Sequence, residues 1–296
     1  MEKRGGAVSE GWNLSKPKLH IYAKFLCTYL AVIIILLLGT LPVYSHYADN
    51  LRQEETAKVV RTLENGIKRL EETVVDLSWA ITSLEEDFTY RRLTSKSESL
   101  TPRELYAAIQ VQKSFAVAVR NTSLLEYAFL SFLNNDIIID LERVYRNSDN
   151  FYGAFLHYTE RDFDNVDDIR AAGNAVLPCQ PVTIRTRSTL LQGEYVTLMF
   201  SNNFGQNTPN TIYAFFGRGQ LLDLLLSPGV AEQGALRIRD AKGQEILYSN
   251  PGQVSLAPDA RGVKLLERDI SLLGLTIQVA VPDAMYVGGL WKAMSR

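Results

Sequence analysis

A chain of 296 residues with a net charge of −2 at pH 7 leaves room for one or two domains beside a membrane segment. Its 46% hydrophobic and 22% charged residues are ordinary for a folded protein, so a sizeable core is expected. The charge balance excludes a strongly basic surface, and this portion of the protein is therefore not expected to bind nucleic acid.

The N-terminal region has the pattern of a membrane anchor. Residues 25–44 read FLCTYLAVIIILLLGTLPVY without a charged side chain. At a rise of about 1.5 Å per residue they cover about 30 Å, the thickness of a bilayer's hydrocarbon layer. A cleaved signal peptide is the alternative, but its apolar stretch is usually only about 7–15 residues long, and LPVYSHY is a poor cleavage site. We therefore expect a transmembrane helix at residues 25–44.

The charges on either side of this helix predict its orientation. Residues 1–24 are basic in balance, and the flank SHYADNLRQEE after the helix is acidic in balance. The positive-inside rule places residues 1–24 in the cytoplasm as a stub and the bulk of the chain outside the cell. We therefore expect a single-pass protein of the cell membrane. The basic residues of the stub are Lys3, Arg4, Lys16, Lys18 and Lys24.

Cysteine usage allows no disulfide in the exported part. Cys27 lies in the expected membrane helix, and Cys179 stands alone beyond it. We expect Cys179 to be a buried small apolar side chain rather than a reactive thiol.

Residues 45–93 are expected to form a long stalk helix. Apolar residues recur there at alternating steps of three and four, the heptad pattern of a narrow buried stripe. Gly66 weakens such a helix by only about 1 kcal/mol relative to Ala. Two interpretations are open: the stripe packs against the chain's own domain, or it is the contact of a parallel homodimer. The stripe comprises Val60, Leu63, Ile67, Leu70, Val74, Leu77, Ile81, Leu84 and Phe88.

Residues 94–226 combine a helix with several strands. After the polar loop TSKSESL, a helix is expected at residues 102–120, with Thr101 as its N-cap, Pro102 at the first position and Glu104 at the third. Asn134-Asn135 is the expected turn of a β-hairpin. The strands are expected at residues 126–133, 136–144, 182–187, 194–202 and 211–217, an irregular aromatic stretch at 151–181, and a leucine-rich helix at 220–226.

Residues 227–284 form a smaller expected unit that opens with a Ser-Pro-Gly break at 227–229. Four short strands follow, around an Ala-Lys-Gly turn and around Leu273-Gly274, and they suggest an antiparallel meander. Residues 285–296 are expected to begin a C-terminal helix. The four strands are expected at residues 235–240, 244–249, 264–271 and 275–281.

The sequence gives no support for catalysis or for a cofactor. Beyond the membrane helix the histidines are His46 and His157, and none of Gly-x-Ser-x-Gly, His-Glu-x-x-His, a Walker loop or Cys-x-x-Cys occurs. The acidic run from Asp162 to Asp168 lacks the sixth-position Gly and the distal Glu of an EF-hand, so we expect a solvated loop and no metal site. We therefore do not expect an enzyme.

Two segments carry a resemblance to a known family. The hairpin RIRDAKGQEILYS and the closing strand GLTIQVAVP, together with the anchor and stalk, resemble the double Cache (dCache) sensor region of bacterial membrane receptors. Most similar are the membrane-bound AraC-type transcription regulators of Gram-positive bacteria. The resemblance implies an α+β fold with two PAS-like (Cache) antiparallel-sheet subdomains, a membrane-distal one at 94–226 and a membrane-proximal one at 227–284.

The same resemblance implies a function and a site. The chain would be the extracytoplasmic input module of a signalling protein, controlling transcription through an AraC-type output domain beyond Arg296. It would bind a small-molecule ligand between the aromatic stretch 151–158 and the strand from Tyr195. The implied ligand contacts are Tyr152, His157, Tyr158, Arg185, Arg187 and Tyr195.

Interpretations of these residues without a role in ligand binding remain open. Because only Thr186 separates Arg185 from Arg187, both would point to one face of a strand and could clamp a carboxylate or phosphate, or they could form surface salt bridges. The aromatic residues could simply pack in the core. An amino-acid ligand is not supported, since the family's Arg-x-Trp-Tyr signature is missing and Gly217-Arg218-Gly219 stands where its aspartate would fall.

Two other functions compete with this one. A histidine kinase or chemoreceptor would carry the same kind of input region with a different output. A membrane-anchored adhesion module would instead bind a protein partner through its sheets, and it would expose a large apolar patch.

Overall fold

The computed structural model describes residues 16–94, 100–120, 122, 124–132, 136–158, 175–187, 190–202, 210–258, 260–283 and 285. The chain divides into two compact units, residues 1–55 and residues 56–296. The predicted hairpin turn at Asn134-Asn135, the acidic run from Asp162 to Asp168 and the C-terminal segment after 285 lie outside the described residues.

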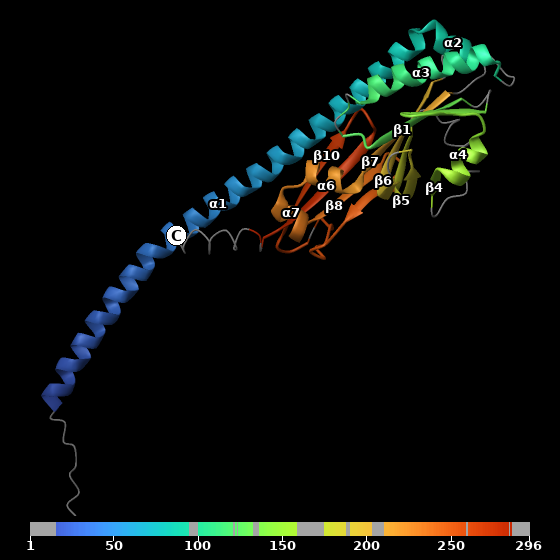
Figure 1. Ribbon diagram of the computed structural model, residues 1–296. Helices are drawn as coiled ribbons and strands as arrows, with labels where there is room; N and C mark the ends of the chain where they lie inside the picture. The colour runs from blue at the N-terminus through green and yellow to red at the C-terminus, as the bar shows by residue number, and fades with distance from the viewer. Residues whose placement is uncertain are drawn as a thin grey trace, which may run out of the picture. The chain divides into compact units, whose positions relative to one another are not determined.

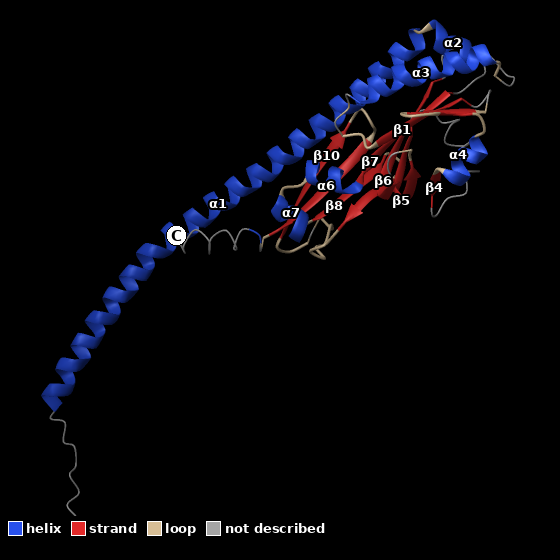
Figure 2. Ribbon diagram, viewed as in Figure 1, coloured by secondary structure: helices blue, strands red, loops and turns tan. Residues whose placement is uncertain are grey.

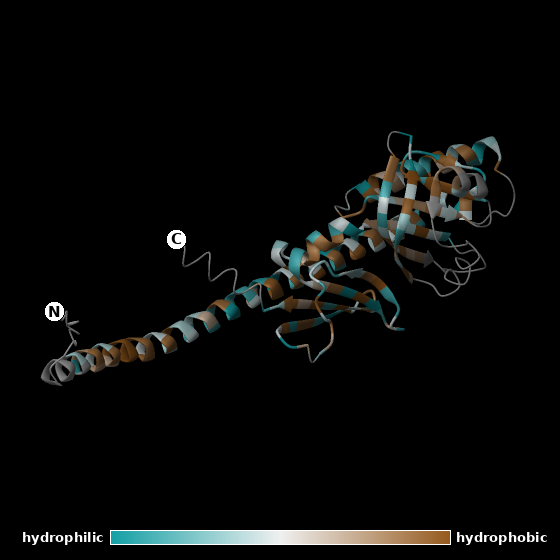
Figure 3. Ribbon diagram, turned by 90° about the horizontal axis from the view of Figure 1, so that it is seen from below, coloured by the Kyte–Doolittle hydropathy of each residue, from teal (hydrophilic) through white to brown (hydrophobic). Residues whose placement is uncertain are grey.

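The first unit is described as the N-terminal part of helix α1 (Lys16–Glu86). Within the described chain, α1 is the one helix long and apolar enough to span a membrane, and its apolar segment is the brown band in Figure 3. Hydroxyl groups in and beside that segment donate back to helix carbonyls: Thr28 to Lys24 at 2.9 Å, and Thr40 to Leu37 at 3.2 Å. Such bonds satisfy polar groups where water is absent.

The stalk part of α1 packs against its own domain. Leu63, Leu70 and Leu77 are buried in a core shared with both sheets, which decides between the two interpretations of the heptad stripe. These buried side chains are not available to a second copy of the chain, so a homodimer through the stalk helix stays a prediction that would have to use its other faces. Phe88, predicted to belong to the stripe, is 78% exposed.

The exposure of Phe88 follows from a break in the helix. The structure ends α1 at Glu86 and begins α2 (Phe88–Thr94) after Asp87, whose Oδ1 accepts the backbone N–H of Thr89 at 2.7 Å. An aspartate in this position caps a new helix and changes the direction in which the following side chains point. The single stalk helix predicted to residue 93 is thus two helices.

Helix α3 (Pro102–Arg120) has the predicted bounds. Glu104 Oε2 accepts hydrogen bonds from the backbone N–H of Thr101 at 2.9 Å and from its hydroxyl at 2.8 Å. The reach of Glu104 back to the N-cap residue is the capping-box contact expected from the sequence. Helix α3 packs against α2, and the two run side by side in Figure 1.

The larger sheet has seven antiparallel strands in the order β3-β2-β1-β7-β6-β5-β4, drawn red in Figure 2. Strand β1 pairs with β2 in the predicted hairpin and with β7 on its other side. The first and the last strand of this sheet along the chain are therefore neighbours at its centre. The strands are β1 (Tyr127–Phe132), β2 (Ile137–Asp140), β3 (Val144–Tyr145), β4 (Leu156–Tyr158), β5 (Ala175–Arg185), β6 (Leu190–Asn202) and β7 (Asn210–Gly217).

The stretch predicted to be irregular, 151–181, contains regular structure where it is described. Helix α4 (Ser148–Ala154) and β4 occupy its start, and β5 begins at Ala175 rather than at 182. Pro178 sits in a register irregularity between Leu177 and Gln180, and Pro181 precedes the part of β5 that pairs with β4. Proline is tolerated at bulges and on unpaired edges, which is why both fit in a strand.

The smaller sheet has four strands in the order β10-β11-β8-β9. A meander would place β9 beside β10, so the predicted meander is wrong: two hairpins join through β8 and β11, which pair from Ala235↔Ala280 to Asp240↔Leu275. This arrangement buries the long apolar strand β11 between two neighbours. The strands are β8 (Ala235–Asp240), β9 (Glu245–Ser249), β10 (Val263–Ile270) and β11 (Leu275–Pro282).

Two short helices connect the sheets. Helix α6 (Arg218–Leu225) follows β7 directly, and α7 (Pro228–Gln233) occupies the Ser-Pro-Gly segment that was predicted to be a break. Pro228 stands at the start of α7, where its missing N–H costs nothing. Sequence reasoning took this proline as an interruption although it also marks a helix start.

Two apolar clusters hold the second unit together. The first, which we call the shared core, joins α1, α3, α6 and α7 to one face of each sheet. The second lies on the opposite face of the seven-stranded sheet and includes residues of α4 and β4. The seven-stranded sheet is thus buried on both faces, whereas the four-stranded sheet contributes to one cluster only.

Candidate functional site

The second cluster is rich in aromatic rings, and we call these rings the aromatic layer. Phe129 stands at its centre: its ring stacks on Tyr213 at 4.5 Å between centroids and meets Phe151 edge-on at 5.0 Å. Alternation along the strands places these side chains on the same face. The layer consists of Tyr127, Phe129, Tyr145, Phe151, Tyr152, Phe155, Tyr195, Tyr213 and Phe215.

A buried carboxylate anchors the end of this layer. Asp140 is fully buried, and its Oδ2 accepts the hydroxyls of Tyr127 at 2.9 Å and Tyr145 at 3.0 Å. Its Oδ1 accepts the backbone N–H groups of Glu142 and Arg143, both at 2.6 Å. Burial and the neighbouring Asp140 charge raise the pKa of both tyrosines well above the usual value. The carboxylate is fully used inside the protein, so it fixes the layer rather than awaiting a ligand.

Two hydroxyl groups on the same face lack such partners. Thr197 and Thr211 are fully buried, and within the part of the chain that the structure describes neither Oγ1 has a hydrogen-bond partner. Alternation with Tyr195 and Tyr213 directs both side chains to the face of the aromatic layer. A buried hydroxyl without a partner is costly and marks a place where a ligand or water group would be favourable.

Of the six predicted ligand contacts, the structure brings two into the layer. Tyr152 contacts Phe151 at 5.5 Å and Phe129 at 6.3 Å between ring centroids. Tyr195 is buried at the other end, in edge contact with Phe215 at 6.2 Å. Burial, and then the nearby Glu126 carboxylate that accepts its hydroxyl, raise the pKa of Tyr195 to about 12.

The predicted arginine clamp does not form as expected. Arg185 ends β5 and is exposed, and since Ile184 points into the second cluster, Arg185 lies on the other face of the strand. Arg187 lies beyond the strand and is also exposed, with its backbone N–H donated to Glu142 Oε2 at 2.8 Å. The alternation that would align the two side chains stops at Arg185.

His157 and Tyr158 belong to strand β4, opposite Thr183 and Val182 of β5. Their side chains lie outside the described part of the structure. Their role as ligand contacts therefore stays a prediction.

Sequence reasoning missed Asp140, Thr197 and Thr211. Strict alternation in the segments YAFLSF and NTIYAFFG could have placed Thr211 on the aromatic face. Asp140 gave no signal, because its partners Tyr127 and Tyr145 are recognisable only once β1, β2 and β3 are paired.

The two sheets meet at a polar junction beside α6. Arg218, the first residue of α6, forms an ion pair with Glu194 of β6 and donates from Nη2 to the Tyr248 carbonyl of β9 at 3.2 Å. One arginine thus bonds to both sheets. Nearby, burial and then the Glu194 charge raise the pKa of the Cys179 thiol to about 11, consistent with the predicted unreactive thiol.

Helix α6 also touches the stalk closely. A Cβ added to Gly66 of α1 would overlap the backbone oxygen of Leu224, so the two helices approach within a distance that only glycine permits. Gly66, which looked like a mild weakness in the helix, is a packing requirement.

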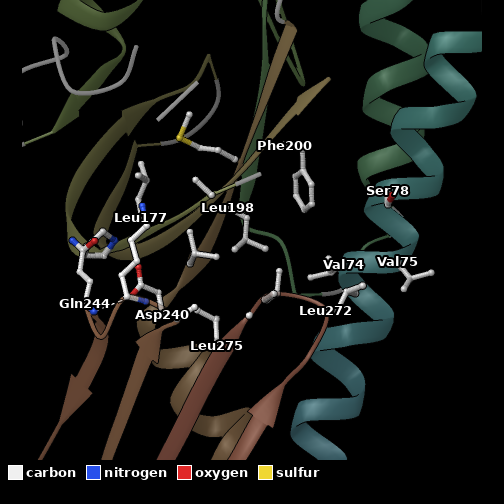
Figure 4. Close-up of a pocket in the computed structure, with 18 of the residues that line it drawn as sticks. Val74, Val75, Ser78, Leu177, Leu198, Phe200, Asp240, Gln244, Leu272 and Leu275 are labelled. Atoms are coloured by element: carbon white, nitrogen blue, oxygen red, sulfur yellow. Dashed lines mark hydrogen bonds between the residues drawn. The ribbon is translucent and has the colours of Figure 1, made fainter. Parts of the chain in front are cut away.

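A cleft of about 970 Å³ opens between α1, strands β5 and β6, and the turns of the smaller sheet. In Figure 4, Val74 and Val75 of α1 lie on one side and Asp240 and Gln244 on the other, with Leu198 between them. We call it the junction cleft. Its lining includes Leu198 of the shared core and also Leu177 and Met199 of the second cluster, but no ring of the aromatic layer.

Within the described residues, no three His, Cys, Asp or Glu side chains are grouped to hold a metal ion.

No protein-family model and no curated protein matches the chain. Among solved structures, the extracellular domain of the histidine kinase candidate soHK1S-Z6 is 10% identical, with a TM-score of 0.50 over 81% of this chain and 98% of that one. The ligand-binding domain of the Pseudomonas aeruginosa PAO1 amino-acid chemoreceptor PctB with L-Gln is 10% identical, with a TM-score of 0.46 over 80% and 98%.

The sensory domain of the Campylobacter jejuni chemoreceptor Tlp3 with isoleucine bound is 11% identical, with a TM-score of 0.41 over 81% and 97%. At this identity the likeness to the first of these structures shows the fold alone. A long N-terminal helix followed by two antiparallel sheets is the architecture of a Cache, or PAS-like, sensory domain, and this chain has that α+β fold.

Proposed function

We propose that the chain is the extracytoplasmic, ligand-sensing input module of a single-pass transmembrane signalling protein. The observation that carries the proposal is the shared core, in which Leu63, Leu70 and Leu77 of α1 pack with both sheets. The same helix continues toward the apolar segment at its N-terminal end. A change in the sheets can therefore act on a helix that reaches a candidate membrane span.

The aromatic layer is the proposed ligand site. Rings with polar tips and a few hydroxyls are the lining that small-molecule sites favour. Tyr152 and Tyr195 would contact the ligand from two sides, and the partnerless hydroxyls of Thr197 and Thr211 would bond to its polar groups. His157 and Tyr158 of the neighbouring β4 are proposed contacts as well, whereas Arg185, on the other face of β5, and the exposed Arg187 lie outside the layer.

Transmission requires two arrangements with different ligand affinity, because a ligand that binds both equally shifts nothing. Helix α6 is the proposed moving part. Its first residue, Arg218, bonds to both sheets, and its last turn rests against Gly66 of the stalk. A displacement of α6 would therefore be passed to α1 directly.

The output is proposed to be an AraC-type transcription domain, on the sequence resemblance. A histidine kinase or chemoreceptor output is an equal alternative, and no catalytic activity is assigned to this portion. The N-terminus is proposed to be cytoplasmic and the sheets extracellular. A homodimer remains part of the proposal, but its contact must use residues outside the buried stripe of α1.

The test is a thermal-shift screen of the full chain in lipid nanodiscs against sugars, organic acids, nucleobases, amino acids and short peptides. A ligand that binds only the folded state adds about 2.7 kcal/mol of stability at a hundredfold excess over its Kd. We expect one class to give a saturable shift that Tyr152→Phe or Thr197→Val reduces and Tyr106→Phe, on the exposed face of α3, leaves unchanged. No shift with any class, from a folded sample, would contradict the proposal.

A further inference from the structure

We propose that the junction cleft is a second ligand site, which takes a small amphipathic carboxylate with an apolar body of the length of a medium acyl chain. The site is distinct from the aromatic layer on the other face of the seven-stranded sheet, because no ring of that layer lines it and Val74, Leu198 and Leu275 of its lining belong to the shared core. It would therefore bind its own ligand, whatever occupies the other face.

The walls of the cleft are apolar. Val74, Leu198 and Leu275 form its buried floor and belong to the shared core. Its volume of about 970 Å³ lies within the range of about 300–1,000 Å³ typical of small-molecule sites. A concave apolar space of this size fits a compact molecule better than a flat protein surface.

Large apolar side chains also stand in solvent at the rim. Trp79 is 70% exposed, Leu272 is 52% exposed and Val75 is 40% exposed, and all three line the cleft. They come from α1 and from the β10–β11 turn. Removing apolar surface from water is favourable by about 25 cal/mol per Å². An acyl chain laid between α1 and this turn would cover these side chains.

The polar end of the cleft is formed by the β8–β9 turn. The Asp240 carboxylate holds that turn, since its Oδ1 accepts the backbone N–H groups of Lys242 at 3.0 Å and of Gln244 at 2.7 Å. The Lys242 ammonium, by contrast, has no ion-pair partner in the described part of the chain and also lines the cleft. The unpaired ammonium and the Gln244 amide supply donors for a carboxylate head group.

Because of the position of the cleft, a ligand bound there would affect how the parts of the protein are arranged. Its walls come from the stalk helix, from the seven-stranded sheet and from two turns of the four-stranded sheet. A molecule that fills it contacts all three parts and favours the arrangement in which they fit it best. The second ligand would thus change the response to the first.

Octanoate is the probe, and Trp79 is the reporter. The full chain is placed in lipid nanodiscs with Trp12→Phe and Trp291→Phe, so that emission comes from Trp79 at the rim. Octanoate is titrated beside octan-1-ol and octylammonium, which have similar apolar bodies with a neutral and a cationic head. We expect a saturable change in emission with octanoate and binding of octylammonium that is about fivefold weaker or more.

Two variants separate the head group from the apolar body. Lys242→Gln should weaken the binding of octanoate about fivefold, which is the effect expected from the loss of one partly exposed charge pair. The affinity for octan-1-ol should stay unchanged. Val75→Phe fills the cleft and should weaken the binding of octanoate and of octan-1-ol by about tenfold or more. Val117→Phe, at an exposed position of α3 outside the cleft, is the matched control and should change neither.

Circular dichroism confirms that each variant is folded. A Trp79 response that does not saturate, or that is the same in Val75→Phe as in the parent chain, would show partition into the lipid and overturn the proposal. Equal affinity for octanoate and octylammonium would overturn the assignment of a carboxylate head.

Discussion

The two sheets have the same antiparallel geometry but differ in what covers them. All six residues of β1 in the seven-stranded sheet are buried, so both of its faces are covered. In the four-stranded sheet, β10 buries Leu266 and Ile270 and exposes Glu267, Arg268 and Asp269 between them. A sheet that faces solvent on one side needs only one core, whereas a doubly covered sheet has a second internal face on which a site can form.

The exposed face of the smaller sheet is stabilised by polar cross-strand pairs. Thr276 donates to Asp269 Oδ1 at 2.8 Å, and Gln278 donates to Glu267 Oε2 at 3.0 Å. Such pairs contribute only about 0.2–1 kcal/mol each. The rings of the aromatic layer should contribute far more, and this contrast can be tested by substitution.

The largest effect is expected for Phe129→Ala at the centre of the aromatic layer. Removing a fully buried ring leaves a cavity and should lower the free energy of unfolding by about 3–5 kcal/mol. Thr276→Val on the solvent face of the smaller sheet is the control and should change it by less than about 1 kcal/mol. Urea unfolding of the full chain in nanodiscs measures both. Equal losses would remove the distinction between the two sheets.

The next largest effect on the free energy of unfolding is expected for Asp140→Asn. The amide keeps the shape but replaces one acceptor oxygen by a donor, so the two tyrosine hydroxyls on Oδ2 and the two backbone N–H groups on Oδ1 can no longer all donate to it. We expect a loss of about 1.5–3 kcal/mol, the range for hydrogen bonds to a charged group. Asp269→Asn makes the same chemical change on the exposed face, and an equally large loss there would contradict the contrast.

Gly66→Ala tests the close approach of α1 and α6. Alanine favours a helix by about 1 kcal/mol, but its Cβ would overlap the Leu224 oxygen, and such overpacking costs about 1–3 kcal/mol. We expect a net loss of up to about 2 kcal/mol. Gly219→Ala within α6 is the matched control, since its Cβ would meet no atom within 4 Å. A stabilised Gly66→Ala chain would show that the contact is not tight.

Alkaline pH should weaken the seven-stranded sheet through its titratable groups. The pKa of Cys179 is raised to about 11 and that of Tyr195 to about 12, because burial favours the protonated forms. A folded-state pKa above the unfolded one gives stability that is complete below the unfolded pKa and is lost as pH rises through the folded pKa.

These two groups should therefore leave the free energy of unfolding unchanged between about pH 7 and 9 and lower it between about pH 9 and 12. Cys179→Ser removes the first titration and should flatten the curve between about pH 9 and 11. Unfolding followed at half-unit steps measures both curves, and an unchanged slope in Cys179→Ser would contradict the assigned cause.

The smallest effect is expected for Arg268→Gln. Arg268 pairs with Glu64 of α1 at 3.2 Å, and both side chains are about half exposed. An exposed pair contributes at most about 1 kcal/mol and is screened by salt. A loss above about 1 kcal/mol, insensitive to salt, would mean that this link between the stalk and the smaller sheet is stronger than surface pairs are.

Local signals predicted much of this fold. The helix at 102–120 was predicted with its observed bounds because Thr101 and Glu104 lie within one turn of each other. The β8–β9 hairpin was predicted because its turn contains Gly243, which adopts the positive φ of 81° that glycine permits. Each of these features depends on neighbours in the sequence.

Contacts between residues far apart in the sequence could not be predicted. The heptad stripe of α1 is compatible with a dimer or with a domain until Leu63 and Leu77 are seen against the sheets. The pairing of β8 with β11 is likewise invisible in four similar short strands. In the site, Tyr152 and Tyr195 were nominated on the family resemblance, and their role as ligand contacts stays a prediction. Asp140, Thr197 and Thr211 depend on strand pairing.

The central claim is that the aromatic layer binds the ligand and that the shared core carries the change to α1. Hydrogen–deuterium exchange of the full chain in nanodiscs, with and without the ligand returned by the thermal-shift screen, tests both parts together. We predict added protection in β1, β6 and β7 and a changed rate in the stalk around Gly66. Protection confined to β8–β11, with β1, β6 and β7 unchanged, would contradict the claim.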